Sequence, residues 1–473
     1  MNTNLKRRFL GYYPTPTEVF MEYIFPEIKA HLYDYLWVDM FSGEGNLILP
    51  MLEAIPEERR IEFFEKHIFL FDIQENMVKK AIEKAMEYGI PKEVAERNIQ
   101  VRDTIEDYPE FLLRMDYPVF HITNPPYLYL GYIMKHEETR KYLKYFKGEK
   151  EGYQDLYQLA LINDLRHGIR KMIYIIPSNF LFGASVSNKI RKDFLAYYTI
   201  KKAIIFERPI FDFTGTNVVI CFFERKNVYG HERIVFEGLK INHDKKKRIY
   251  VLDPKNNYRA GLEFEEFVKS AKADKPLEVQ FYLLLDDVKK NEGQIEVEVI
   301  DVNDFEGGKY KKKKIYVNEK LAQKIRSNIL FIKTLDTGTA KGRAGLYRIR
   351  DFFEADGILV SKEKYRTHPI QVFLHPTLSI EDQILLRDYF NLVLEYFREI
   401  TDSEFMTTYK YSDSEYTRKY LGLSQAKALI QTFPILEMND EEKLTLKDLI
   451  SKKDGEGLVS YIKNRKRKKV LWV

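Results

Sequence analysis

The sequence predicts an α/β protein, with a doubly wound, Rossmann-like sheet followed by a second domain of mixed α+β structure. From about residue 37 to residue 220, short runs of β-branched and aromatic residues alternate with longer, charged stretches of helical periodicity. After about Arg225 this alternation stops, and lysine-rich turns and mixed patterns take its place. We therefore expect a first domain at residues 1–228 and a second at residues 229–473.

The expected strands of the first domain are brief and strongly apolar. They lie at residues 36–38, 68–71, 99–101, 119–122, 172–176, 203–206 and 218–223. Helical patterns at residues 76–88 and 153–165 separate some of them. Because parallel strands are covered on both faces, their side chains need not alternate between apolar and polar. The pattern therefore indicates a parallel sheet between layers of helices.

Length and composition limit the class of protein. A chain of 473 residues, 45% of them hydrophobic, is long enough for two cores. Lysine and arginine (76) nearly balance aspartate and glutamate (71), so overall charge alone does not indicate a nucleic acid partner. No stretch of about 18 uncharged apolar residues occurs, and the one cysteine, Cys221, lies in an apolar run. We expect a soluble, cytoplasmic protein with no membrane segment, disulfide or metal site.

The sharpest motif is Asn124-Pro125-Pro126-Tyr127, directly after the predicted strand at 119–122. A proline pair by itself merely stiffens a loop, but ligands of doubly wound sheets bind at the carboxyl ends of strands, which favours a catalytic role here. The prolines restrict the backbone and present carbonyl oxygens outward. The Asn124 side chain and the Pro125 carbonyl can then accept hydrogen bonds from an amine conjugated to an aromatic base, and turn its lone pair toward a methyl donor. Tyr127 is expected to stack on that base.

Further candidates follow the first three predicted strands. Asp39 begins a run in which Gly43 and Gly45 permit close approach of the backbone to a ligand. Asp72 ends the second strand, where it can accept both ribose hydroxyls of a nucleoside cofactor. Asp103 follows the third strand and can accept a hydrogen bond from an adenine amino group. Taken singly, a tight turn and surface aspartates are the ordinary alternatives.

Together these residues resemble the amino-methylating (adenine-N6) DNA methyltransferases of the gamma arrangement and of restriction-modification type. In that family the cofactor motifs precede the catalytic loop and a recognition domain comes last; the resemblance covers about residues 9–225. It implies S-adenosyl-L-methionine as the cofactor, with Asp39 at the methionine ammonium, Asp72 at the ribose and Asp103 at the adenine. The residues assigned to the cofactor are Tyr13, Thr15, Asp39, Phe41, Gly43, Gly45, Asp72, Ile73, Asp103 and Asn124. Those assigned to catalysis are Asn124, Pro125, Pro126 and Tyr127.

The resemblance implies base stacking by Tyr127 and by Phe211. A phenylalanine of the core is the alternative for Phe211, and Phe213 is a substitute candidate. The first glycine motif departs from the family, because Met40 and Phe41 follow Asp39 where many members carry proline and a small residue. This departure concerns the methionine end of the cofactor and leaves the reaction class unchanged.

The implied activity is site-specific methylation of the N6 amine of adenine in double-stranded DNA after base flipping. Asn124 at the first loop position favours adenine; the alternatives are the N4 amine of cytosine, a guanine in RNA or a protein glutamine. Methylation at a ring carbon requires a cysteine nucleophile that the buried-looking Cys221 does not supply. We expect a monomer that modifies DNA without cleaving it; a cognate restriction endonuclease acting separately is the partner that this setting allows.

Basic residues of the second domain are candidates for DNA contact. Lys341 and Arg343 lie in the glycine-rich stretch 337–345, which can approach a phosphate backbone closely; an ordinary mobile loop is the alternative. Lysine runs at residues 245–248, 311–314 and 465–469 are more often solvated faces than contact sites.

Overall fold

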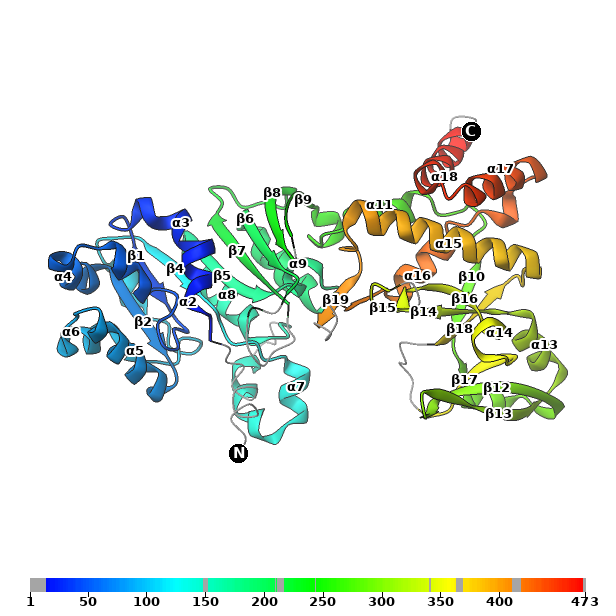
Figure 1. Ribbon diagram of the computed structural model, residues 1–473, viewed down its shortest axis with the longest axis horizontal. Coiled ribbons are helices and arrows are strands. Elements are labelled where there is room, and N and C mark those ends of the chain that lie inside the picture. Colours follow the sequence, from blue (N-terminus) through cyan, green and yellow to red (C-terminus); the bar gives the residue numbers. More distant parts are fainter. Residues whose placement is uncertain are drawn as a thin grey trace. The chain divides into compact units, whose positions relative to one another are not determined.

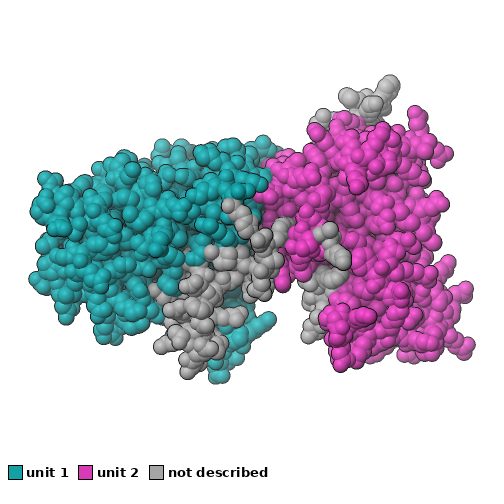
Figure 2. Space-filling model, viewed as in Figure 1, with its two compact units in different colours: residues 1–260, 410–415 teal, residues 261–409, 416–473 magenta. Residues whose placement is uncertain are grey.

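The computed structural model describes residues 14–147, 152–208, 210, 217–242, 244–339, 342–362, 369–410 and 418–470. The chain divides into two compact units (Figure 2): one comprises residues 1–260 and 410–415, and the other comprises residues 261–409 and 416–473. Each unit has its own hydrophobic core.

The first unit is built on a nine-stranded sheet with the strand order β3-β2-β1-β4-β5-β7-β6-β8-β9 (Figure 1). Its first seven strands are β1 (Leu36–Asp39), β2 (Ile68–Asp72), β3 (Ile99–Val101), β4 (Val119–Thr123), β5 (Lys171–Pro177), β6 (Tyr198–Phe206) and β7 (Val218–Arg225). Each of the seven predicted strands lies within one of these. Strands β3, β2, β1, β4 and β5 pair in parallel, whereas β7 runs antiparallel between β5 and β6. The predicted doubly wound sheet is confirmed.

Helices cover this sheet because their apolar faces are buried against it. In α5, for example, Val78, Ala81 and Ala85 are buried at spacings of three and four residues, and Glu75 lies in the first turn, where a negative charge is favourable. The helical segments of the unit are α2 (Thr17–Val19), η1 (Phe20–Ile24), α3 (Phe25–Ile28), η2 (Lys29–His31), η3 (Leu49–Ala54), α4 (Glu57–His67), α5 (Glu75–Glu87), α6 (Lys92–Asn98), η4 (Glu110–Arg114), α7 (Leu130–Lys135), η5 (Glu137–Phe146), α8 (Leu156–Arg166), α9 (Asn179–Phe182), η6 (Ser185–Ser187), α10 (Asn188–Leu195) and η7 (Pro254–Asn256).

A final hairpin extends the sheet beyond the predicted boundary. Strands β8 (Ile234–Ile241) and β9 (Lys245–Leu252) pair with each other, and β8 also pairs in parallel with β6. Gly238 allows the close packing, since a side chain there would collide with the ring of Tyr250. The first unit therefore reaches Ala260 instead of ending after residue 228, because β8 satisfies the main-chain groups of β6.

The second unit has mixed α+β structure, as predicted. Its sheets have the orders β10-β18-β14-β16, β11-β17-β12-β13 and β15-β20-β19. The strands are β10 (Glu278–Phe281), β11 (Leu283–Leu284), β12 (Glu292–Glu306), β13 (Lys309–Val317), β14 (Leu330–Lys333), β15 (Leu335–Asp336), β16 (Gly345–Arg348), β17 (Gly357–Val360), β18 (Ile370–His375), β19 (Thr407–Lys410) and β20 (Arg418–Tyr420). The helices are α11 (Leu262–Ser270), α12 (Leu285–Lys290), α13 (Glu319–Ser327), α14 (Ile349–Phe353), α15 (Ile380–Thr401), α16 (Leu423–Ile430), η9 (Ile435–Glu437), α17 (Asp440–Ser451) and α18 (Gly455–Val470). No helix in the described ranges is long and apolar enough to cross a membrane.

Candidate active site

Four of the predicted site residues lie at the carboxyl ends of four adjacent strands. Asp39 ends β1, Asp72 ends β2, Asp103 follows β3 and Asn124 follows β4. The order β3-β2-β1-β4 sets these strand ends side by side, which brings together residues that are far apart in the sequence. This edge is where ligands of doubly wound sheets bind.

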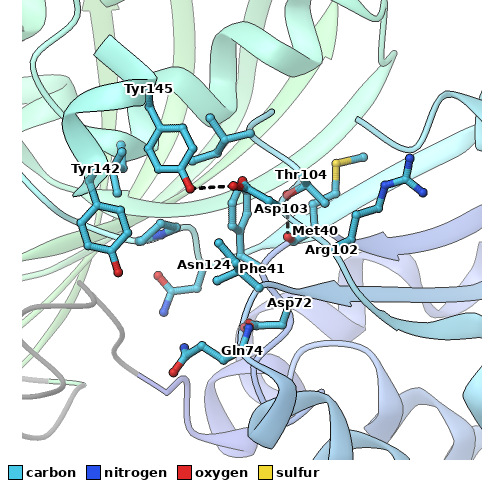
Figure 3. Close-up of a pocket in the computed structure, with 14 residues that line it drawn as sticks. Met40, Phe41, Asp72, Gln74, Arg102, Asp103, Thr104, Asn124, Tyr142 and Tyr145 are labelled. Carbon is cyan, nitrogen blue, oxygen red and sulfur yellow. Dashed lines mark hydrogen bonds between the residues drawn. The ribbon is translucent and has the colours of Figure 1, made fainter. Parts of the chain in front are cut away.

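A cleft opens at this edge (Figure 3). It encloses about 600 Å³, including space open to solvent, and is lined by Met40, Phe41, Asp72, Ile73, Gln74, Arg102, Asp103, Thr104, Ile105, Asn124, Pro126, Tyr142, Tyr145 and Leu156. A second, smaller cavity is lined by Pro14, Thr15, Asp39, Phe41, Ser42, Glu44, Asn46, Leu47 and Asn124. Phe41 and Asn124 border both. The two cavities therefore adjoin, one largely apolar with carboxylates at its rim and the other small and polar.

The turn after β1 is held by its glycines. Gly43 and Gly45 have positive φ angles of 51° and 81°, in the region that favours glycine. The Gly43 N–H donates to Oδ2 of Asp72 at 2.9 Å, which ties the turn to the end of β2. A side chain at Gly45 would also collide with Leu49. The backbone geometry of this turn therefore favours glycine at both positions, and close approach of the turn to a ligand remains a prediction.

Asp39 is a buried carboxylate, 1% exposed. Its Oδ1 accepts hydrogen bonds from the Thr123 hydroxyl at 2.6 Å and from the Phe41 N–H at 3.0 Å. Burial raises the pKa of Asp39 to about 6, although the Thr123 hydrogen bond and nearby His121 oppose the rise. An ionised carboxylate with this much lost solvation gains from a cationic partner in the adjoining cavity.

Asp72 is also buried, and both of its oxygens accept backbone hydrogen bonds. Oδ2 accepts from Gly43, and Oδ1 accepts from the Gln74 N–H at 2.8 Å. Burial raises the pKa of Asp72, whereas these two hydrogen bonds lower it. Since each carboxylate oxygen has two lone pairs, Asp72 can still accept from hydroxyls of a ligand in the cleft.

The Asn124-Pro125-Pro126-Tyr127 loop is anchored on both sides. The Asn124 Nδ2 donates to the Thr15 hydroxyl at 3.0 Å, and the Leu128 N–H after the loop donates to Oδ1 of Asp155 at 2.8 Å. Burial raises the pKa of Asp155 to about 7. The Tyr127 hydroxyl lies 2.7 Å from the Ile175 carbonyl oxygen and 2.5 Å from Oδ1 of Asn124, so its single proton is shared between two acceptors.

Tyr127 itself is buried, at 9% exposure, and does not line either cavity. Its side chain reaches from the loop to β5 through the Ile175 contact. The tyrosine therefore stiffens the loop in this structure, and stacking on a base remains a prediction.

A buried polar network that sequence reasoning missed lies on β4 and α8. Asp164 is 0% exposed and accepts hydrogen bonds from Nδ1 of His121 at 2.6 Å and from the hydroxyls of Tyr174 and Tyr108 at 2.5 and 2.9 Å. Nε2 of His121 accepts from the Met40 N–H at 3.3 Å, which supports the turn after β1. The only signal in the sequence is that His121 and Asp164 interrupt apolar runs.

Sequence reasoning also missed Tyr142 and Tyr145 of η5, which line the cleft beside Asp103 (Figure 3). The Tyr145 hydroxyl donates to Oδ2 of Asp103 at 2.7 Å. No motif marks these tyrosines, since the segment between the Asn124-Pro125-Pro126-Tyr127 loop and α8 is held at the cleft only by tertiary contacts.

Some predicted residues cannot be compared with the structure. Tyr13, Phe211, Phe213 and Lys341 lie outside the described residues. Ile73, by contrast, lines the cleft with 51% of its surface exposed, and Thr15 lines the smaller cavity.

The predicted DNA contact Arg343 is already paired within the second unit. Its guanidinium lies 3.7 Å from Asp336 and 3.3 Å from Glu395. Asp336 is 0% exposed and also pairs with the buried Arg398 at 2.9 Å. A phosphate would therefore compete with carboxylates for Arg343.

The lysine run at 311–314 is paired as well. It lies on β13, opposite acidic residues of β12, and each lysine is within 4 Å of a carboxylate. The run is thus solvated and charge-balanced, with its lysines alternating between the two faces of the hairpin.

Comparison with known proteins agrees with the site geometry. The sequence profile described as N-6 DNA methylase matches residues 4–307, more than half of the chain. Comparison with curated proteins gave no match.

Three solved structures are similar to this chain at low sequence identity. A nuclease-deletion mutant of the Type ISP restriction-modification enzyme LlaGI, in complex with a DNA substrate mimic, is 12% identical over 90% of this chain and 47% of that chain, with a TM-score of 0.50. A type I restriction-modification methyltransferase subunit from Streptococcus thermophilus is 16% identical over 48% and 46%, with a TM-score of 0.33. The DrdV–DNA complex is 13% identical over 54% and 32%, with a TM-score of 0.39. The chain thus spans less than half of each protein.

The family match rests on sequence, and it agrees with the resemblance that the Asn124-Pro125-Pro126-Tyr127 loop and the strand-end carboxylates indicate. The chain therefore belongs to the N-6 DNA methylase family.

Proposed function

We propose that the protein transfers a methyl group from S-adenosyl-L-methionine to the N6 amine of adenine in double-stranded DNA, as the modification part of a restriction-modification system. The observation that carries this proposal is the opening of the Asn124-Pro125-Pro126-Tyr127 loop onto a cleft rimmed by Asp72 and Asp103. Family membership supports the reaction class.

The two adjoining cavities suit the two ends of this cofactor. Asp39 is the group in the smaller cavity that would meet the methionine ammonium, and its lost solvation makes a cation favourable there. Asp72 would accept hydrogen bonds from the ribose hydroxyls of the cofactor, and Asp103 would accept a hydrogen bond from the amine of the cofactor's adenine. When bound, S-adenosyl-L-methionine supplies a methyl group activated by a sulfonium.

The chain's own contribution to transfer is orientation of the amine. The exocyclic nitrogen of adenine is weakly nucleophilic because its lone pair is delocalised into the ring. Oδ1 of Asn124 and the Pro125 carbonyl oxygen would each accept a hydrogen bond from one of its two N–H groups. These bonds would draw the nitrogen toward tetrahedral geometry. To free Oδ1 of Asn124 for the amine, the Tyr127 hydroxyl would keep its hydrogen bond to the Ile175 carbonyl and give up the one to Asn124. The proton of the methylated amine leaves to solvent without a dedicated base.

DNA recognition is assigned to the second unit in this proposal.

A base within a duplex must be flipped out, which costs a few kcal/mol and needs an aromatic pocket. Tyr127 and Phe211 are the candidates for its walls, and Lys341 and Arg343 are the candidates for phosphate contact. Modification without cleavage is proposed, with any restriction endonuclease acting separately.

Mass spectrometry of digested DNA tests the proposal. The purified chain is incubated with S-adenosyl-L-methionine and unmethylated genomic DNA, and N6-methyldeoxyadenosine is expected. Asn124→Ala and Tyr127→Ala should abolish its formation while S-adenosylhomocysteine still binds in calorimetry, because the carboxylates are unchanged. Tyr129→Ala is the matched control, since Tyr129 is on the same loop but 44% exposed.

Formation of N4-methyldeoxycytidine would contradict the choice of adenine. Full activity in the Asn124 variant would contradict the mechanism. Specific fragments from a plasmid incubated with magnesium would contradict modification without cleavage.

A further inference from the structure

The segment between the catalytic loop and α8 brings two tyrosines to the rim of the cleft. Tyr142 and Tyr145 both belong to η5 (Glu137–Phe146), and their ring centroids are 6.1 Å apart with the ring planes 25° apart. Tyr142 is buried, and Tyr145 is half-buried. The Tyr145 hydroxyl donates a hydrogen bond to Asp103, whereas the Tyr142 hydroxyl points away from Asp103 (Figure 3).

The donors around Asp103 converge on one of its two oxygens. Oδ2 accepts from the Tyr145 hydroxyl at 2.7 Å and lies 3.3 Å from the Lys144 ammonium. Lys144 also donates to Glu106 at 2.6 Å. Two carboxylates of the loop after β3, Asp103 and Glu106, therefore hold η5 against that loop. Oδ1 of Asp103 receives no side-chain hydrogen bond from the described residues and is left for a ligand in the cleft.

We propose that Tyr145 is a positioning residue that sets the preference of the cofactor cleft for a 6-amino purine. Its hydroxyl holds the Asp103 carboxylate by Oδ2, so that Oδ1 accepts a hydrogen bond from the 6-amino group of the cofactor's adenine. This inference rests on the use of S-adenosyl-L-methionine proposed above, and it assigns a role to a residue of this chain that no motif marks.

The discrimination follows from the fixed orientation of the carboxylate. A 6-oxo purine would present a carbonyl oxygen to Oδ1, and two acceptors that face each other repel. A carboxylate free to rotate could relieve this repulsion, whereas one held by a neighbouring hydroxyl cannot. Burial, followed by the hydrogen bond to Asp103, raises the pKa of Tyr145, so its hydroxyl remains a donor throughout the physiological range.

Calorimetry with the cofactor product and a 6-oxo analogue of it tests the proposal. S-adenosylhomocysteine carries the 6-amino group and S-inosylhomocysteine carries a 6-oxo group in its place. For the wild-type protein we expect the adenosyl compound to bind at least about tenfold more tightly, since a site built to pair an N–H rejects a ligand that lacks it. Tyr145→Phe keeps the ring and should reduce this ratio about three- to tenfold, the scale of one typical hydrogen bond.

Three further variants make the test specific. Asp103→Asn, which can also donate to a 6-oxo group, should bring the ratio close to one. The double variant, Tyr145→Phe with Asp103→Asn, should lower the affinity ratio no further than Asp103→Asn alone, because Tyr145 acts through Asp103. Tyr142→Phe is the matched control: it removes a hydroxyl from the same segment and cleft and should leave the ratio unchanged. Thermal unfolding followed by circular dichroism verifies that each variant is folded.

Two results would overturn the inference. One is an unchanged ratio in Tyr145→Phe together with a ratio near one in Asp103→Asn, and the other is an equal fall in Tyr145→Phe and Tyr142→Phe. Failure of the wild-type protein to bind either compound would overturn the proposed cofactor itself, and this inference with it, so the two failures are distinguishable.

Discussion

Replacing Asp39 by asparagine should weaken cofactor binding and stabilise the cofactor-free protein at the same time. The asparagine Oδ1 can still accept from the Thr123 hydroxyl and the Phe41 N–H, so the local hydrogen bonds are retained. What is lost is the charge. Burial raises the pKa of Asp39 from 3.8 to about 6, a difference of roughly two units. At 1.36 kcal/mol per unit, ionised Asp39 therefore costs the folded state about 3 kcal/mol.

The sign of the pH dependence follows from the raised pKa. Because the folded protein holds the Asp39 proton more tightly than the unfolded chain, this group's contribution to stability is fully present below about pH 3.8 and is lost as the pH rises through about 6. Asp39→Asn should thus raise the free energy of unfolding at pH 7.5 by up to about 3 kcal/mol, with a smaller gain at pH 5. Urea denaturation followed by fluorescence of Trp37, which is 0% exposed in the core of the first unit, measures this change.

Cofactor affinity should change in the opposite direction. The proposed ammonium contact needs ionised Asp39, so wild-type affinity should fall about tenfold from pH 7 to pH 5 as roughly nine-tenths of Asp39 becomes protonated. Asp72, whose pKa is also raised by burial, adds to this fall, and the difference between wild type and Asp39→Asn isolates the Asp39 part. Calorimetry with S-adenosylhomocysteine provides the measurement. Equal affinities and parallel pH profiles for the two proteins would refute the reasoning.

Three further predictions concern the buried network, Tyr127 and the lysine run. Asp164→Asn should lower the free energy of unfolding of the first unit by about 3 kcal/mol, because it removes the charge that three buried donors surround; urea denaturation measures this, and a loss below about 1 kcal/mol would count against it. Tyr127→Phe should retain single-turnover methyl transfer within about tenfold, since only a hydroxyl shared between two acceptors is removed, whereas equal inactivity of Tyr127→Phe and Tyr127→Ala would show that the hydroxyl is essential. Replacing all four lysines at 311–314 by glutamine should change DNA affinity by no more than about twofold in fluorescence anisotropy, because each is paired with a carboxylate; a loss beyond tenfold would identify this face as a DNA contact.

The first sheet was predictable because its strands are short apolar runs whose character depends on local sequence. The seven predicted strands all lie within observed ones, and the strand-end positions of Asp39, Asp72, Asp103 and Asn124 followed directly from them. The first unit extends past the predicted boundary after residue 228, because β8 pairs with β6 and β9 pairs with β8. β9 is partly exposed and lysine-rich, so only this pairing shows that the hairpin belongs to the sheet. Pairing between distant strands leaves no mark in local periodicity.

By itself, the sequence predicted the reaction class and the candidate residues for it, because a rigid Asn124-Pro125-Pro126-Tyr127 loop after a strand is a local property of backbone and side-chain chemistry. The tertiary structure alone decided how those residues are held. It set the Tyr127 hydroxyl between Asn124 and Ile175, placed His121 and Asp164 behind the turn after β1, and brought Tyr145 to Asp103. These contacts join residues up to 81 positions apart, and their formation depends on packing that no single segment encodes.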